Sequence, residues 1–217
     1  MKTIIFANGE FKSPLQPLEF QDDDQIIAAD GGSQHCLSLG IQPGVLIGDM
    51  DSTDPAQVDK WREEGVEIIQ YPEEKDQTDL ELAILLAQDR GARKIVVHGA
   101  TGGRLDMTIG NLSLLAHPDL KTPTTLINGA EEVHLLHAGE MLTLVGKSEE
   151  LISLLPIQPG TSIVTTIGLK YPLKNEPLVY GLSRGISNQL TGNRGTVHLE
   201  SGLLCVVHTR TTSLEED

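Results

Sequence analysis

Residues 25–52 read QIIAADGGSQHCLSLGIQPGVLIGDMDS, and this stretch decides the fold class. A short apolar run, Gln25 to Ala29, is followed by a glycine-rich turn and then by a segment of helical periodicity from Gly32 to Leu39. A second apolar run, Val45 to Ile47, then leads into an acidic loop. Short strands that alternate with helices are typical of a parallel sheet with crossover connections. The stretch therefore predicts an α/β fold.

The same alternation continues outward and then stops. Apolar runs predict further strands at 3–7, 67–70, 94–98 and 124–127, and helical periodicity predicts helices at 55–64, 78–90 and 108–116. Beyond residue 131 only strand-like runs follow, at 132–137, 141–145, 151–156, 162–167, 195–199 and 203–208. We therefore expect an α/β domain with a largely parallel, Rossmann-like sheet over residues 1–134 and an all-β sandwich over residues 135–217.

The composition argues against several classes of partner. The chain has 31 acidic and 16 basic side chains and a formal net charge of −15, which disfavours nucleic acids and anionic membrane surfaces. No stretch approaches the roughly 20 apolar residues that cross a bilayer. The two cysteines, Cys36 and Cys205, do not indicate a disulfide framework. We expect a cytoplasmic protein that binds neither nucleic acid nor membranes.

Acidic side chains follow several of the predicted strands. In α/β sheets, ligands bind outside the carboxyl ends of the strands. Asp49 and Asp51 are two residues apart, so on an extended segment their side chains would share a face and approach one hard cation together. The same predicted sheet edge gathers three more acids, namely Asp30, Asp76 and Asp79. Crowded carboxylates repel one another unless a cation lies among them, so the pattern predicts a Mg²⁺ site.

Two glycine-rich loops could bring backbone N–H groups close to a phosphate. Gly31-Gly32 opens a predicted helix, and Gly102-Gly103 precedes Arg104, whose guanidinium suits bidentate phosphate contact. Neither loop matches a Walker sequence. Each feature also has an ordinary structural interpretation, because glycine pairs and Asp are common in turns, and Asp76 or Thr78 could cap the following helix. The convergence of acids at strand ends is what favours a catalytic site.

Six motifs, in order along nearly the whole chain, resemble the thiamine pyrophosphokinase family. They are Ala29-Asp30-Gly31-Gly32, Gly48-Asp49-Met50-Asp51-Ser52, Lys75-Asp76-Gln77-Thr78-Asp79, Gly102-Gly103-Arg104-Leu105-Asp106, Gly168-Leu169-Lys170-Tyr171-Pro172-Leu173 and Gly185-Ile186-Ser187-Asn188. The resemblance implies Mg²⁺-dependent transfer of pyrophosphate from ATP to the hydroxyethyl oxygen of thiamine, which gives thiamine diphosphate and AMP. It also implies a homodimer, with a nucleotide-binding catalytic domain and a C-terminal β-sandwich for thiamine binding and dimerisation.

The resemblance also implies roles for individual residues. Asp49, Asp51 and Asp79 would hold Mg²⁺, while Asp30, Asp76, Arg104 and Asp106 would act in catalysis. The substrate-contacting positions would be Gly31, Gly32, Lys75, Thr78, Gly102, Gly103 and Arg104, with Ser187 and Asn188 in a thiamine segment supplied across the dimer. Met107 stands where many relatives carry His, and Gln189 where bacterial members often carry Glu. These departures concern the thiamine contacts and leave the metal site intact.

Two other functions fit part of the pattern. Asp49-Met50-Asp51-Ser52-Thr53 also matches the Asp-x-Asp-x-Thr sequence of haloacid-dehalogenase-type phosphatases, with Asp49 as the nucleophile. That sequence normally belongs to the first strand, whereas two predicted strands precede it here. A non-catalytic nucleotide-sensing module could share the fold, but it has no use for five clustered acids. Pyrophosphoryl transfer is therefore the preferred function.

Overall fold

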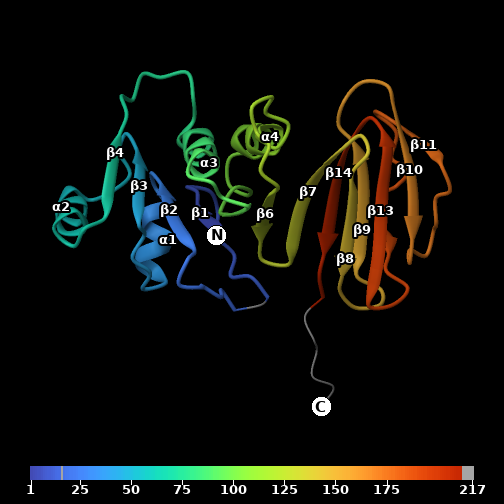
Figure 1. Cartoon of the computed structure of the whole chain (residues 1–217), viewed down its shortest axis with the longest axis horizontal. Helices are drawn as coiled ribbons and strands as arrows, with labels where there is room; N and C mark the ends of the chain where they lie inside the picture. The colour runs from blue at the N-terminus through green and yellow to red at the C-terminus, as the bar shows by residue number, and fades with distance from the viewer. Residues whose placement is uncertain (16, 212–217) are drawn as a thin grey trace, which may run out of the picture. The chain divides into compact units, whose positions relative to one another are not determined.

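The computed structural model describes residues 1–15 and 17–211. The chain divides into two compact units, Met1–Gly129 and Ala130–Asp217, and its elements can be followed by colour in Figure 1. The boundary expected from the sequence, after residue 134, falls later than this division and lies inside strand β7 (Glu131–His137).

The first unit is a parallel sheet with helices between its strands. The strand order is β6-β5-β1-β2-β3-β4, and every pairing between these neighbours is parallel. The strands are β1 (Lys2–Phe6), β2 (Gln25–Ala29), β3 (Val45–Gly48), β4 (Glu67–Gln70), β5 (Lys94–His98) and β6 (Thr124–Asn128). The helices are α1 (Gly32–Ser38), α2 (Pro55–Glu63), α3 (Asp79–Asp89) and α4 (Leu105–Leu114). Within the described part of the chain, no helix is long and apolar enough to cross a membrane.

Both faces of this sheet are covered because its strands are apolar at consecutive positions. On one face, strand residues such as Phe6 and Leu46 form a buried cluster with Cys36 of α1 and Trp61 of α2. Helix α3 buries an apolar stripe of its own and contacts β2 and β3. Since a crossover helix begins at the carboxyl end of the strand before it, the first residue of α3, Asp79, comes to the edge of the sheet where β2 and β3 end.

The strand order reverses at β1. The chain places β2, β3 and β4 in sequence on one side of β1, and β5 and β6 on the other side. The two loops that leave the sheet at this reversal start side by side, because Ala7 N donates to His98 O (2.8 Å) and Gly9 N donates to Gly99 O (2.7 Å). Ligands of open α/β sheets bind in the crevice that such a reversal creates at the carboxyl ends of the strands.

The second unit is built from antiparallel strands. One set has the order β12-β9-β14-β7, and a separate four-stranded sheet has the order β11-β10-β13-β8. Inward-facing residues of both sets, such as Leu154 and Leu199, form a single buried cluster. The remaining strands are β8 (Met141–Val145), β9 (Leu151–Pro156), β10 (Thr161–Ile167), β11 (Glu176–Val179), β12 (Asn188–Gln189), β13 (Arg194–Ser201) and β14 (Leu203–Thr209). The β-structure of the chain is therefore mixed, and the expectation of a β-rich second half is confirmed.

Strands β11 and β12 were not expected from the sequence. β11 contains Pro177, which lacks an N–H donor and therefore weakens a strand pattern, and the structure places it at the edge of its sheet. β12 is a two-residue strand, Asn188–Gln189, which is too short to show an alternating pattern.

Glu132, in the second unit, should make the free energy of unfolding depend on pH. Burial by itself raises the pKa of the Glu132 carboxyl, but the neighbouring His134 and Arg210 outweigh it and lower the pKa from 4.5 to about 2. Because the folded pKa is depressed, the stabilisation is fully present above pH 4.5 and is lost as the pH falls towards 2. We expect Glu132→Gln to lower the free energy of unfolding at pH 7 by up to about 3 kcal/mol.

Denaturant unfolding of both proteins between pH 7 and pH 2 measures this effect. The difference between the parent and Glu132→Gln should shrink as the pH falls below 4.5. Glu131→Gln, at the exposed neighbouring position of β7, is the matched control and should leave the unfolding free energy nearly unchanged. A difference that stays constant down to pH 2 would contradict the assignment.

Candidate active site

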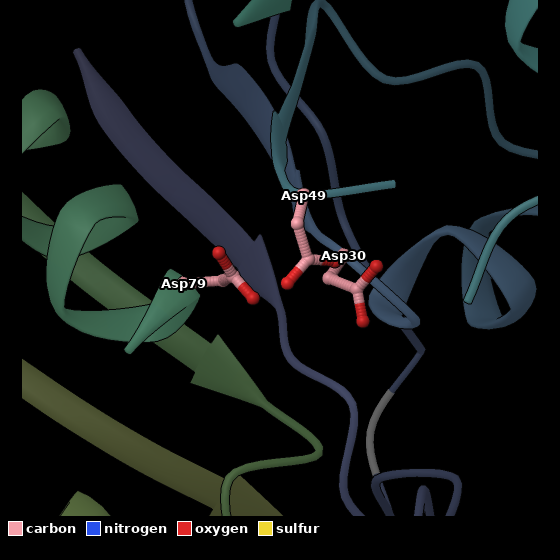
Figure 2. Close-up of side chains that lie close together, drawn as sticks. All are labelled: Asp30, Asp49 and Asp79. Carbon is pink, nitrogen blue, oxygen red and sulfur yellow. The ribbon is translucent and has the colours of Figure 1, made fainter. Parts of the chain in front are cut away.

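Three carboxylates from different elements meet at the carboxyl edge of the first unit's sheet (Figure 2). Asp30 follows β2, Asp49 follows β3, and Asp79 is the first residue of α3. Each offers an oxygen atom that lies within 4.8 Å of the others. Asp30 is buried, whereas Asp49 and Asp79 are half-buried. The fold therefore gathers side chains that are up to 49 positions apart in the sequence.

A glycine makes this convergence possible. Gly48 has φ +147°, and a Cβ placed on it would lie 3.0 Å from Asp30 Cβ and 3.1 Å from Asp79 Cγ. Any larger residue at position 48 would push these two carboxylates apart. Asp30 is in turn held by two donors, because Ser52 N donates to its Oδ1 (3.3 Å) and Asn8 Nδ2 donates to its Oδ2 (3.3 Å).

Lys75 brings a positive charge to the acids. Its Nζ lies 3.5 Å from Asp49 Oδ2 and 3.1 Å from Asp79 Oδ1. Burial acts to lower the pKa of Lys75, but Asp79 and Asp49 outweigh it and raise the pKa above its usual value. The backbone N–H of Asp51, together with Lys75, lowers the pKa of Asp49. Burial raises the pKa of Asp79, and the negative charges of Asp49 and Asp30 raise it further. Lys75 lowers this pKa, but its effect is smaller than the sum of the others.

The cluster fits a hard divalent cation. Among the described residues, Asp79 Oδ1 is buried and accepts no hydrogen bond of regular geometry, although Lys75 Nζ lies close to it. The single positive charge of Lys75 offsets only part of the charge of the three clustered carboxylates, and crowded carboxylates favour a further cation among them. The three groups supply only oxygen ligands, which Mg²⁺ prefers over nitrogen and sulfur.

The acids form part of the wall of a cavity of about 950 Å³. The wall is made by the loops after β1, β2, β3, β4 and β5 and by residues of α3 and α4. The expected site residues that line it are Asp30, Asp49, Lys75, Thr78, Asp79, Gly102, Gly103 and Arg104. The cavity therefore lies where the strand order reverses.

Three of the expected acids, Asp51, Asp76 and Asp106, lie outside this lining. Met50 has φ +70°, and Asp51 N donates to Asp49 Oδ1 (3.1 Å), so the chain turns between the two aspartates. The prediction of an extended backbone, which would have placed the Asp49 and Asp51 side chains on one face, is therefore wrong. Asp51 is exposed and accepts a hydrogen bond from Ser52 Oγ (2.9 Å). Asp76 is also exposed. The roles of Asp51 and Asp76 stay predictions.

Gly31 and Gly32 are explained by packing. A Cβ on Gly32 would lie 1.9 Å from the carbonyl oxygen of Phe6, and one on Gly31 would lie 2.0 Å from Asn8 Oδ1. Glycine at these positions lets α1 approach β1 closely. Neither residue lines the cavity, so their contact with a phosphate stays a prediction.

The loop between β5 and α4 has the conformation that its glycines allow. Gly102 and Gly103 have φ values of +87° and +67°, which L-residues with side chains rarely adopt. Gly102 N donates to Thr108 Oγ1 (3.1 Å), which ties the loop to α4.

Arg104 and Asp106 form a bidentate pair at the surface. Arg104 Nη2 donates to Asp106 Oδ2 (2.6 Å), and its Nε donates to Oδ1 (3.1 Å). The hydrogen bond from Arg104 lowers the pKa of Asp106 and raises that of Arg104 itself. Arg104 lines the cavity, whereas Asp106 does not.

Thr78 has the capping role that the sequence suggested. Its Oγ1 accepts a hydrogen bond from Glu81 N (3.2 Å) at the start of α3. Because Asp79 is the next residue, this cap also fixes the direction in which the Asp79 side chain leaves the helix.

Ser187 and Asn188 belong to the second unit. The Asn188 side chain is buried, and its Oδ1 accepts hydrogen bonds from Tyr171 N (3.0 Å) and Gln189 N (2.9 Å). Its Nδ2 donates to Tyr171 O (2.8 Å). Asn188 thus joins two segments that the sequence had singled out separately. Ser187 is exposed with φ +59°, and the contact of both residues with thiamine stays a prediction.

Sequence reasoning missed several residues of the cavity wall. Asn8, Gly9 and Glu10 line it and lie in the loop that follows β1. The strand-end rule that singled out the other loops applies equally to them and could have found them. Met107 and Asn111 line the cavity from α4. The sequence marked Met107 only as a departure from the family pattern, and no pattern in the sequence marks Asn111.

The family models and the related proteins that match this chain all carry the same family name. The model of the thiamin pyrophosphokinase catalytic domain matches residues 17–127, and the model of the thiamin pyrophosphokinase vitamin B1 binding domain matches residues 142–204. The chain is 32% identical to thiamine pyrophosphokinase of Bacillus subtilis, over 95% of this chain and 98% of that protein. It is 31% identical to thiamine pyrophosphokinase 1 of Arabidopsis thaliana, over 80% of this chain and 68% of the relative.

Solved structures agree with this result. The crystal structure of thiamine pyrophosphokinase from Bacillus subtilis superposes with a TM-score of 0.85 at 27% identity, covering 97% of this chain and 99% of that one. The structure of thiamin pyrophosphokinase from Geobacillus thermodenitrificans gives a TM-score of 0.84 at 28% identity, covering 98% and 99% of the two chains.

Proposed function

The chain belongs to the thiamine pyrophosphokinase family, and from this membership we propose that it transfers pyrophosphate from ATP to the hydroxyethyl oxygen of thiamine. The products are thiamine diphosphate and AMP. The observation that carries the proposal is the meeting of Asp30, Asp49 and Asp79 within 4.8 Å at the carboxyl edge of the sheet. This is where a Rossmann-like domain binds a nucleotide.

The acids would hold Mg²⁺, with Asp49 and Asp79 as the principal ligands and Asp30 beside them. When bound, Mg²⁺ neutralises charge on the triphosphate and supports an in-line attack. Asp51, which is exposed in the loop after Asp49, completes the proposed ligand set. Lys75 lies between Asp49 and Asp79 and is within reach of a phosphate that enters the cavity.

Other residues of the wall would orient the triphosphate. The N–H groups of the loop that contains Gly102 and Gly103 can approach phosphate oxygens without a side chain in the way. Arg104 lines the mouth of the cavity and can exchange its partner Asp106 for a phosphate, because both side chains are exposed. Before a phosphate enters, Asp106 would keep the guanidinium in place.

A carboxylate must accept the proton of the attacking hydroxyl group. Asp30 and Asp76 are the two predicted acceptors. Asp30 lines the cavity, whereas Asp76 is exposed and outside it, so we assign this role to Asp30.

The second unit would supply the thiamine contacts. The match of residues 142–204 to a vitamin B1 binding domain supports this assignment. We propose that the protein acts as a cytoplasmic homodimer in which Ser187 and Asn188 face the thiamine bound by the other subunit. Size-exclusion chromatography with light scattering tests the dimer, and a monomer at micromolar concentration would contradict it.

The direct test is to incubate the purified protein with ATP, Mg²⁺ and thiamine and to follow AMP and thiamine diphosphate by chromatography. Equal amounts of the two products are expected. Asp51→Asn should lower the rate by about tenfold or more, because it removes a charged ligand from the cation. An unchanged rate in Asp51→Asn would remove Asp51 from the ligand set.

The same assay separates the two other functions. A phosphatase of the haloacid-dehalogenase type would release free phosphate and form an acyl-phosphate on Asp49, and a sensor would bind nucleotide without turnover. The comparisons favour neither function. Asp49 also follows the third strand of the chain, not the first strand as in those phosphatases.

A further inference from the structure

We infer that Asn8 is a positioning residue for the carboxylate cluster, an inference that rests on the proposed function. Asn8 lines the cavity, and its Nδ2 donates to Asp30 Oδ2 (3.3 Å). The amide nitrogen must face the carboxylate, since the amide oxygen would repel it. Together with Ser52 N on Oδ1, this bond occupies both oxygens of Asp30 and fixes the plane of its carboxylate.

Asp30 needs this support because its backbone conformation is unusual. It has φ +44°, a region that is costly for a residue with a side chain and that persists only where the surroundings hold it. Gly31 leaves the space that Asn8 fills, because a Cβ there would lie 2.0 Å from Asn8 Oδ1. Asn8 therefore packs on the backbone of Gly31 and also donates a hydrogen bond to the Asp30 carboxylate.

Asn8 is itself anchored on both sides. Ala7 N donates to His98 O (2.8 Å), and Gly9 N donates to Gly99 O (2.7 Å). The Nε2 atom of His35 lies 2.9 Å from Gly9 O. Because a carbonyl oxygen can only accept, Nε2 carries the hydrogen and donates it. These contacts fix the backbone on which Asn8 stands, so its amide presents one direction to Asp30.

Groups that orient metal ligands through hydrogen bonds typically contribute 10- to 100-fold to metal affinity. We therefore expect Asn8→Ala to weaken binding of Mn²⁺, used alone as a probe for Mg²⁺, by about tenfold or more. Titration of the full chain with Mn²⁺, followed by electron paramagnetic resonance without ATP or thiamine, measures this affinity. In the activity assay, the KM for the metal-nucleotide complex should rise more than kcat falls.

Asn128→Ala is the matched control. Asn128 lies in the same loop region but is buried, whereas Asn8 is exposed. Its Oδ1 accepts from Lys12 N (2.9 Å) and its Nδ2 donates to Thr101 O (3.4 Å). It is outside the cavity lining and has no hydrogen bond with an acid in the described residues. Asn128→Ala should lower the melting temperature at least as much as Asn8→Ala, because Asn128 is the more buried of the two. It should leave the Mn²⁺ affinity within about twofold of the parent.

The outcomes separate this inference from the proposed function. Equal Mn²⁺ affinity in the parent and in Asn8→Ala would overturn the role of Asn8, and so would equal weakening in Asn8→Ala and Asn128→Ala. Weakened Mn²⁺ binding in Asn8→Ala alone, in a protein that forms no thiamine diphosphate, would support the role of Asn8 and reject the proposed function.

Discussion

Asp79→Asn should lower the rate of thiamine diphosphate formation by about 10³-fold, which corresponds to about 4 kcal/mol of transition-state stabilisation. Asn keeps the size of the side chain and removes the charge on the oxygen that lies nearest to Lys75. The folding stability should not fall, because burial already disfavours the ionised carboxylate and raises its pKa. Steady-state kinetics and thermal unfolding of the same preparation measure both effects.

The control for this prediction lies on the same helix. Asp89 is exposed at the last position of α3, far from the cavity. Asp89→Asn makes the same chemical change and should leave the rate within about twofold of the parent. If Asp79→Asn kept more than about a tenth of the activity, Asp79 would not be a principal ligand.

Gly32→Ala should destabilise the first unit by about 3 kcal/mol, at the upper end of the cost of overpacking. The new Cβ would lie 1.9 Å from the carbonyl oxygen of Phe6 and 2.4 Å from its carbonyl carbon. These atoms belong to the backbone of β1 at the centre of the sheet, so a rotamer change cannot relieve the clash. Either α1 or β1 must move. Denaturant unfolding measures the loss.

Gly110→Ala is the matched control for the same chemical change. Gly110 lies within α4, and a Cβ on it would have nothing within 4 Å. Alanine there should stabilise the protein by about 0.5 to 1 kcal/mol, because it lowers the entropy of the unfolded chain and favours the helix. If both substitutions had the same effect, close packing would not be the reason for glycine at position 32.

The sequence predicted those parts of the site that depend on position along a strand. Asp30 and Asp49 directly follow apolar runs, and Asp79 opens a strongly periodic helix. Strand ends of a parallel sheet share an edge, so the meeting of these acids could be expected before their distances were known. The prediction that Thr78 caps the helix is also confirmed. Capping could be predicted because it depends on the local sequence.

The parts that could not be predicted depend on backbone turns and on close packing. The left-handed conformation of Met50 separates Asp51 from Asp49, and nothing in the residue type of Met50 signals it. The approach of Gly32 to Phe6 joins segments that the sequence does not relate. The sequence analysis did not select Asn8, because its amide is uncharged, although it directly follows the strand expected at 3–7.

The position of Lys75 between Asp49 and Asp79 also bears on how the protein folds. The ammonium group is a built-in counter-ion, so the mutual repulsion of the acids is already partly neutralised when α3 docks on the sheet. Folding of the first unit therefore does not have to wait for a divalent ion. Under the proposed function, Asp49 and Asp79 would take up the divalent ion in place of the ammonium group in a preformed site, and Lys75 would then be free to meet the incoming triphosphate.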